Sequence, residues 1–142
     1  MAQAELLALF SRKQGMKSTG DPLKDVKRGW DDWVEFAIEQ PHLVRALQAS
    51  GGTTTQPLRE AAESIVAGRL ARLATTVPLA LDTPTAARVL VAGANAVVQM
   101  LLDGLSVAEV RGLSVLLRDR LVSSLVADRS RSTSSKPRRL AR

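Results

Sequence analysis

Helix-start signals recur along this sequence, and the segments between them have the periodicity of helices rather than of strands. Asp21 and Thr83 each precede a proline, so a capping side chain stands in front of a residue that fits the first helical position. Ser106 and Glu109 form an S-x-x-E capping box, in which each side chain can satisfy the other residue's free backbone N–H. The sequence therefore predicts an all-α fold.

The spacing of these signals predicts six helices. Gly15 ends the first helix, Pro41 separates the second from the third, and the pair Gly51 and Gly52 separates the third from the fourth. The predicted helices cover residues 5–13, 21–40, 41–49, 53–81, 83–104 and 106–128.

The positive charge is concentrated at the C-terminus. The whole chain carries a net charge of +6, but six Lys and Arg oppose one Asp from Asp128 onward, which leaves +1 for residues 1–127. We therefore expect one helical domain at residues 1–128 and a disordered basic tail at residues 129–142. The tail is interpreted as a solvated end, with loose contact to nucleic acid as the alternative.

Several classes of function are disfavoured by the residues present. There is no cysteine, which excludes disulfides, thiolate metal sites and cysteine nucleophiles. His42 is the single histidine, and no serine elbow or Gly-rich phosphate loop accompanies it. We expect no enzymatic activity, no metal and no cofactor.

The N-terminus does not have the pattern of a signal peptide, because Gln3 and Glu5 interrupt it. The longest apolar segment, residues 89–102, contains Asn95 and Gln99 and is shorter than the ~20 residues of a membrane span. We expect a cytoplasmic protein without a membrane contact, in which this segment is a buried helix.

The last two predicted helices have more apolar surface than one core requires. Helix 83–104 is apolar almost all round, and helix 106–128 has two apolar faces separated by Arg111 and Arg118. Each large aliphatic side chain left exposed forgoes about 1.5–3 kcal/mol, so this surplus favours self-association. The alternative is a monomer that covers both helices internally.

The order of these parts resembles the C-terminal domain of TetR-type (tetracycline-repressor-like) transcriptional regulators. The stretch from Trp30 to Leu47, WDDWVEFAIEQPHLVRAL, is similar to an aromatic amphipathic helix of that family that ends in E-x-P and restarts as a short helix. The segment AELLALF, which begins at Ala4, resembles the helix that follows the family's DNA-binding headpiece. The resemblance extends from Ala4 to about Ala127.

This resemblance implies a six-helix domain that binds an effector and forms a homodimer, with the last two helices of each subunit in a four-helix bundle. The family's helix-turn-helix headpiece has no counterpart in this sequence, so we expect no operator binding by this chain alone. DNA would be bound only through such a headpiece. The expected dimer contacts are Val89, Ala92, Gly93, Ala96, Leu113, Leu117, Arg120, Leu121 and Ser124.

In the family, the effector lies among the helices that correspond to the first, second, fourth and fifth helices here. The expected effector is a small apolar or amphipathic molecule. The candidate ligand-binding residues are Phe10, Trp30, Trp33, Phe36, Ile65, Arg69, Leu73, Asn95 and Gln99.

Each group of candidates has an ordinary structural alternative. The aromatic residues could be plain core, and Asn95 and Gln99 could join helices or lie exposed beside Arg88. Arg69 could bind a carboxylate of the effector, or it could reach water or pair with a neighbouring Asp or Glu. The alternative function is a structural helical dimer or protein-interaction module without a ligand.

Overall fold

A computed structural model describes residues 18–49 and 52–126 of the chain. This part contains helices and no strands, and a lone antiparallel bridge joins Leu79 to Val126. Its helices are α2 (Pro22–Glu39), α3 (Pro41–Ala49), α4 (Gly52–Ala74), α5 (Thr83–Leu102) and α6 (Val107–Leu125). The prediction of an all-α fold is confirmed. The predicted helix at residues 5–13 and the basic tail lie outside the described residues, so the total of six helices stays a prediction.

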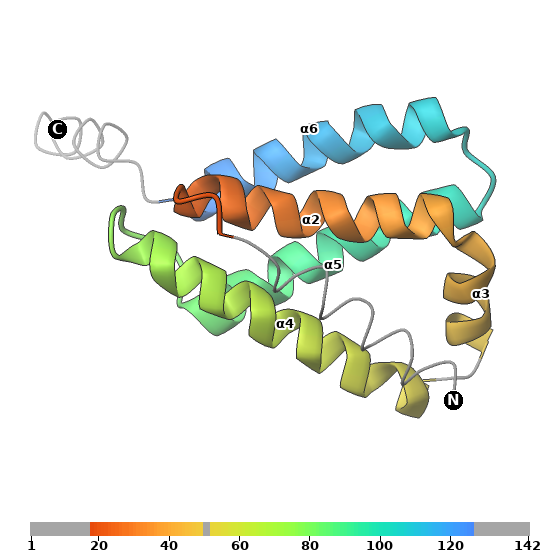
Figure 1. Cartoon of the computed structure of the whole chain (residues 1–142), viewed down its shortest axis with the longest axis horizontal. Helices are drawn as coiled ribbons and strands as arrows, with labels where there is room; N and C mark the ends of the chain where they lie inside the picture. Colours follow the sequence, from red (N-terminus) through yellow and green to blue (C-terminus); the bar gives the residue numbers. More distant parts are fainter. Residues whose placement is uncertain (1–17, 50–51, 127–142) are drawn as a thin grey trace, which may run out of the picture.

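The central helix of the arrangement is α5. It packs against α4, α6 and α2, while the short α3 connects α2 to α4 at one end of the molecule (Figure 1). The chain reverses direction between α4 and α5 and again between α5 and α6 (Figure 1). Because three helices cover it, α5 can be apolar on nearly every side. In the described part of the chain, α5 alone is long and apolar enough to cross a membrane, a property shared by core helices of soluble proteins.

The helix starts follow the predicted capping, with one correction. The carboxylate of Asp21 accepts hydrogen bonds from the backbone N–H groups of Leu23 and Lys24, and the capping box of Ser106 and Glu109 is complete. The cap of α5, however, is Asp82 rather than Thr83. The carboxylate of Asp82 accepts a hydrogen bond of 3.1 Å from the backbone N–H of Thr85. Thr83 is therefore the first helical residue.

The fourth helix was predicted to reach Leu81, which is wrong, because α4 ends at Ala74. Pro78 lacks a backbone N–H, and its ring disfavours helical geometry at the residue before it. The segment that follows pairs instead with the end of α6, where the backbone N–H of Ala80 donates to the carbonyl of Leu125 over 2.7 Å. This pairing also ends α6 at Leu125, before the predicted Asp128.

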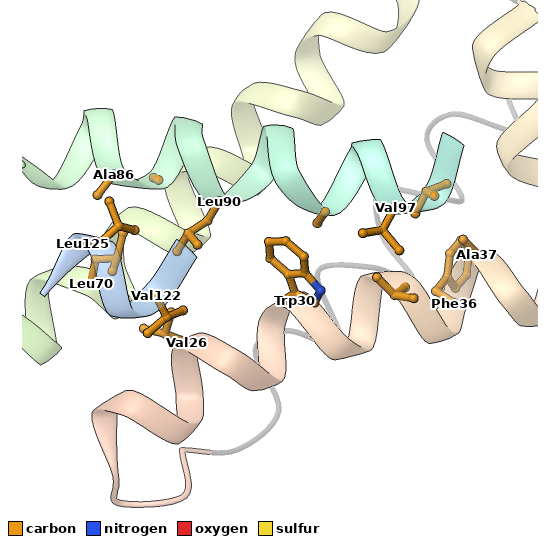
Figure 2. Packing of buried hydrophobic residues seen from close by; sticks show 14 of the residues in the cluster. Val26, Trp30, Phe36, Ala37, Leu70, Ala86, Leu90, Val97, Val122 and Leu125 are labelled. Atoms are coloured by element: carbon orange, nitrogen blue, oxygen red, sulfur yellow. The ribbon is translucent and has the colours of Figure 1, made fainter. Parts of the chain in front are cut away.

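Trp30 is buried in the core and points from α2 toward α5 (Figure 2). Its indole N–H donates a buried hydrogen bond of 2.8 Å to the hydroxyl of Ser114 on α6. Its ring lies close to Gly93 on α5, where an added Cβ atom would stand 3.0 Å from the ring and 2.5 Å from Leu121. The absence of a side chain at Gly93 therefore lets three helices meet at one point.

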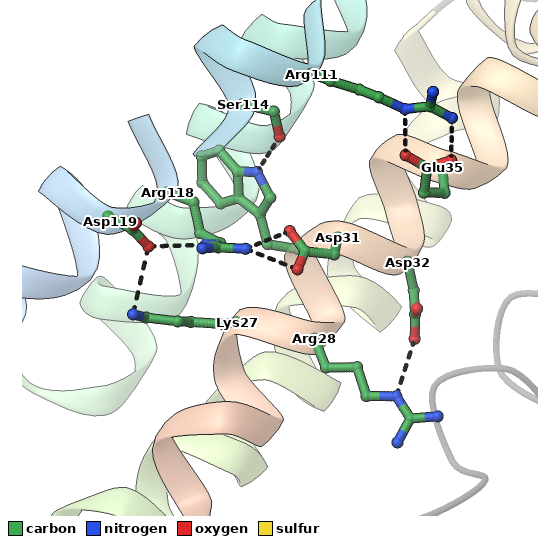
Figure 3. A network of polar contacts seen from close by, with 10 residues as sticks. Lys27, Arg28, Asp31, Asp32, Glu35, Arg111, Ser114, Arg118 and Asp119 are labelled. Carbon is green, nitrogen blue, oxygen red and sulfur yellow. Dashed lines mark hydrogen bonds and ion pairs between the residues drawn. The ribbon is translucent and has the colours of Figure 1, made fainter. Parts of the chain in front are cut away.

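Ion pairs hold α2 against α6 on the outer side of this core (Figure 3). Arg118 binds Asp31 over 2.7 Å, and Arg111 binds Glu35 over 2.8 Å. Lys27 adds a third ion pair of 3.3 Å with the carboxylate of Asp119. The hydrogen bond from Arg111 lowers the pKa of Glu35, and its charge adds to this effect. These ion pairs set the register between the two helices.

Replacing Gly93 by alanine is expected to lower the free energy of unfolding by about 1–2 kcal/mol. The new methyl group would collide with Leu121 and with Trp30, whose indole is held by its hydrogen bond, and this outweighs a gain of about 1 kcal/mol in helix propensity. Urea denaturation measures the difference. Gly68→Ala on α4 is the matched control, since nothing lies within 4 Å of its added Cβ, and it should raise stability by about 0.5–1 kcal/mol. Equal gains in both variants would contradict the packing at Gly93.

Candidate functional site

A cavity of about 450 Å³ lies between α2, α4 and α5. Residues of α3 line it as well, and α6 contributes one valine. The size falls within the range of small-molecule sites, and the lining is mainly apolar, as such sites usually are. The lining residues are Val26, Gly29, Trp30, Trp33, Val44, Leu47, Gln48, Leu58, Arg59, Ala62, Ile65, Val66, Leu90, Val91, Ala94, Asn95, Val98, Gln99 and Val122.

Both tryptophans of the chain line this cavity. The polar atom of Trp30 is already bound to Ser114, so this residue offers only apolar surface to the cavity. Trp33 stacks on Phe36 with ring centroids 5.9 Å apart, and its indole N–H donates to Oδ1 of Asn95 over 2.8 Å. Both indole N–H groups already donate hydrogen bonds within the protein. The two rings can therefore contact an apolar ligand without leaving a hydrogen-bond donor unsatisfied.

Polar side chains from α3 and α5 form the rest of the lining. Nε2 of Gln48 donates to Oε1 of Gln99 over 3.0 Å, and Nε2 of Gln99 donates to Asp103 over 2.9 Å. Asn95 is bound to α2 through Trp33. The interpretation of Asn95 and Gln99 as residues that join helices is therefore confirmed, and the same side chains also line the cavity.

The structure brings together five of the nine candidate ligand residues. These are Trp30, Trp33, Ile65, Asn95 and Gln99. Two others, Phe36 and Leu73, are buried in the core and do not line the cavity. Arg69 also lies outside the lining, and Phe10 lies outside the described residues.

Arg69 has a structural partner instead of a place in the cavity. Its side chain is only 7% exposed, and its Nη1 donates to the backbone carbonyl of Asp25 over 2.8 Å. Burial lowers the pKa of Arg69, while the negative charges of Asp25 and Asp32 act in the opposite direction. Of the two alternatives for Arg69, the structure shows a contact with a neighbouring helix, because this arginine ties α4 to α2, and binding of an effector carboxylate by Arg69 stays a prediction.

Asp25 is a buried carboxylate where α2 contacts α4, and no feature of the sequence marked it as a candidate. It accepts hydrogen bonds from the backbone N–H and the hydroxyl of Thr19, each 2.9 Å long, and from the hydroxyl of Ser18 over 2.8 Å. The backbone hydrogen bond from Thr19 is the main cause of a lowered pKa for Asp25. A serine and a threonine before the helix start were the available signal, but hydroxyl residues there are ordinary capping candidates.

The structure adds lining residues from α3 and α4 that were not expected. Val44, Leu47 and Gln48 of α3 line the cavity, as does Arg59 of α4. The periodicity of α3 marked an amphipathic helix but did not show which neighbour its apolar face covers. Arg59 carries no sequence signal that separates it from the other exposed arginines.

The expected dimer contacts divide into two groups. Ala92, Ala96, Leu113, Arg120 and Ser124 are exposed, and Val89 and Leu117 are half-buried. The other two, Gly93 and Leu121, are close to each other within the subunit, so they belong to the contact between α5 and α6.

Searches with protein-family models, among curated proteins and among solved structures found no match to this chain. Within residues 18–49 and 52–126, no three His, Cys, Asp or Glu side chains converge as a metal site would require. The geometry of the cavity is therefore the main structural observation that bears on function.

Replacing Asp25 by asparagine is expected to destabilise the protein by about 2 kcal/mol at pH 7, because an amide cannot accept all three hydrogen bonds to this buried carboxylate. The lowered pKa of Asp25 means that its contribution to stability is present above the ordinary aspartate pKa of 3.8 and is lost as pH falls through the folded-state pKa. Urea denaturation at a series of pH values should therefore show the difference closing below about pH 3.8. Ser18→Ala, which removes one hydrogen bond, should give a smaller loss, and a difference constant with pH would contradict the assignment.

Proposed function

We propose that this protein is a small-molecule-binding and dimerisation domain of the TetR-regulator type, which senses a mainly apolar ligand in the cavity between α2, α4 and α5. The observation that carries the proposal is a cavity of about 450 Å³ with two indole rings and few polar groups in its lining. Its place among the second, fourth and fifth predicted helices agrees with the effector position implied by the sequence resemblance.

The shape of the lining favours a bound molecule over a filled core. Small residues from three different helices face the cavity, namely Gly29, Ala62 and Ala94. The cavity is partly open to solvent, and apolar lining left in contact with water forgoes the free energy of burial. A ligand that fills the volume would recover that free energy and would raise the melting temperature through linkage.

The exposed face of α6 supports the dimer in this proposal. Leu113, Leu116, Arg120 and Ser124 are exposed and follow one another at spacings of three or four residues, so they share one side of the helix. Leu116 is 53% exposed, which is unusual for a large aliphatic residue in a stable monomer unless it contacts a partner. A second copy of this chain is the partner that we propose.

The ligand part of the proposal is tested with N-phenylnaphthylamine, a neutral apolar fluorophore. It should quench or shift the tryptophan emission on binding and raise the melting temperature, because its site lies beside Trp30 and Trp33. Ala62→Phe should fill the cavity and weaken binding at least tenfold. Ala71→Phe on the exposed side of the same helix is the matched control and should bind as the unmodified protein does. Equal binding by both variants, or no binding at all, would favour a structural dimer without a ligand.

The dimer part is tested by light scattering at micromolar concentration. Leu113→Lys should convert the expected dimer into a folded monomer, because it puts a charge into the proposed apolar contact of α6. Leu23→Lys is the matched control, since Leu23 has similar exposure but lies on α2. A monomeric unmodified protein would overturn the dimer, and the regulator interpretation with it.

A further inference from the structure

One charged side chain lines the cavity in the part of the chain that the structure describes, and it is the guanidinium of Arg59 on α4. Every other lining residue there is apolar or carries an uncharged amide or indole. No carboxylate of residues 18–49 and 52–126 takes part in the lining. The cavity therefore has a positive charge that is not matched by a negative one within its own walls.

The two carboxylates nearest to Arg59 along α4 contact other residues. Glu63, one turn along α4, contacts Arg88 of α5 over 3.9 Å. Glu60 accepts a hydrogen bond of 3.1 Å from Gln56. Among the described residues, Arg59 makes no ion pair, although Glu60 and Glu63 line a second, polar pocket together with it.

The position of Arg59 follows from the way α4 and α5 run in opposite directions. Glu63 lies level with Arg88, so Arg59 lies about one turn further along α5, near Ala92. Asn95 uses its carbonyl oxygen to accept from Trp33, which leaves its amide N–H groups as donors. Arg59 and Asn95 both line the cavity, from facing helices.

The opposite end of the cavity is apolar. Val26 at the start of α2, Leu90 at the start of α5 and Val122 at the end of α6 lie together there (Figure 2). The polar lining residues Gln48 and Gln99 come from the other end, where α3 meets α5, and Arg59 lies between the two ends, level with Ala92. The cavity is therefore amphipathic along its length.

From this arrangement we propose that the ligand of the cavity is an amphiphile with a single carboxylate. Its carboxylate binds the guanidinium of Arg59, with the amide of Asn95 as a second donor, and its apolar part extends past Trp30 toward Val26 and Val122. This inference deepens the proposed function and rests on it. A guanidinium with a carboxylate gives a charge-assisted hydrogen bond, which is stronger and more selective than a contact with a neutral head group.

The test compares three probes with the same twelve-carbon chain: dodecanoate, dodecanol and dodecyltrimethylammonium. Each is titrated below its aggregation concentration, with tryptophan emission as the readout. We expect dodecanoate to bind at least tenfold more tightly than dodecanol and the cationic probe to bind most weakly. Arg59→Gln should weaken dodecanoate binding about tenfold and leave dodecanol binding unchanged.

Arg72→Gln is the matched control, because Arg72 is an exposed arginine of the same helix that does not line the cavity. It should bind all three probes as the unmodified protein does. Since Arg59 is exposed, its variant should keep the melting temperature of the unmodified protein, which separates a lost contact from a lost fold.

The outcomes separate this inference from the proposed function. If dodecanol and N-phenylnaphthylamine bind in the cavity but dodecanoate has no advantage, or if Arg59→Gln and Arg72→Gln act alike, the carboxylate inference is wrong and ligand binding stands. If the cationic probe binds best, the inference is wrong as well. If no probe binds, charged or neutral, both the inference and the proposed function are overturned.

Discussion

The fold depends on the packing of one indole ring into the place where three helices meet. Trp30 leaves α2, passes a glycine of α5 and donates its N–H to a hydroxyl of α6. Each of these contacts needs the other two, because the ring can reach Ser114 only if Gly93 gives it room. A single side chain therefore determines how far α5 lies from α2 and α6, and it forms one wall of the cavity at the same time.

Polar contacts then determine the register that the apolar packing leaves open. The pairs of Lys27 and of Arg111 in the row between α2 and α6 are exposed, so each of them adds little stability in water, while Arg118 is partly buried. Its value lies in specificity, since a shift of one turn would place like charges opposite each other. Arg69 and Asp25 have the corresponding role between α2 and α4, but inside the protein, where an unpaired charge would be costly.

The parts of this structure that could be predicted are those that depend on neighbours in the sequence. The capping box at Ser106 and the cap at Asp21 follow from local hydrogen bonds, and the apolar periodicity of α2 and α5 predicted a helical fold with a buried central helix. The end of α4 was missed because it depends on a contact with α6, far along the chain. The cavity was predicted in part, through residues on the buried faces of helices. Arg59 was missed, and the alternatives for Arg69 could not be separated, because periodicity does not show whether an arginine on a helix faces a carboxylate, a cavity or water.

Why the helices leave a cavity at all follows from the sizes of the side chains that face it. Gly29, Ala62 and Ala94 stand on α2, α4 and α5, and larger residues such as Trp30, Leu58 and Leu90 line the same cavity. Hydrogen bonds fix the placement of these helices, because Arg69 ties α4 to α2 and Asn95 ties α5 to α2. A rigid frame around small residues produces a preformed site, and a preformed site binds without the cost of ordering itself. The same frame that stabilises the fold thus maintains the volume that we propose a ligand fills.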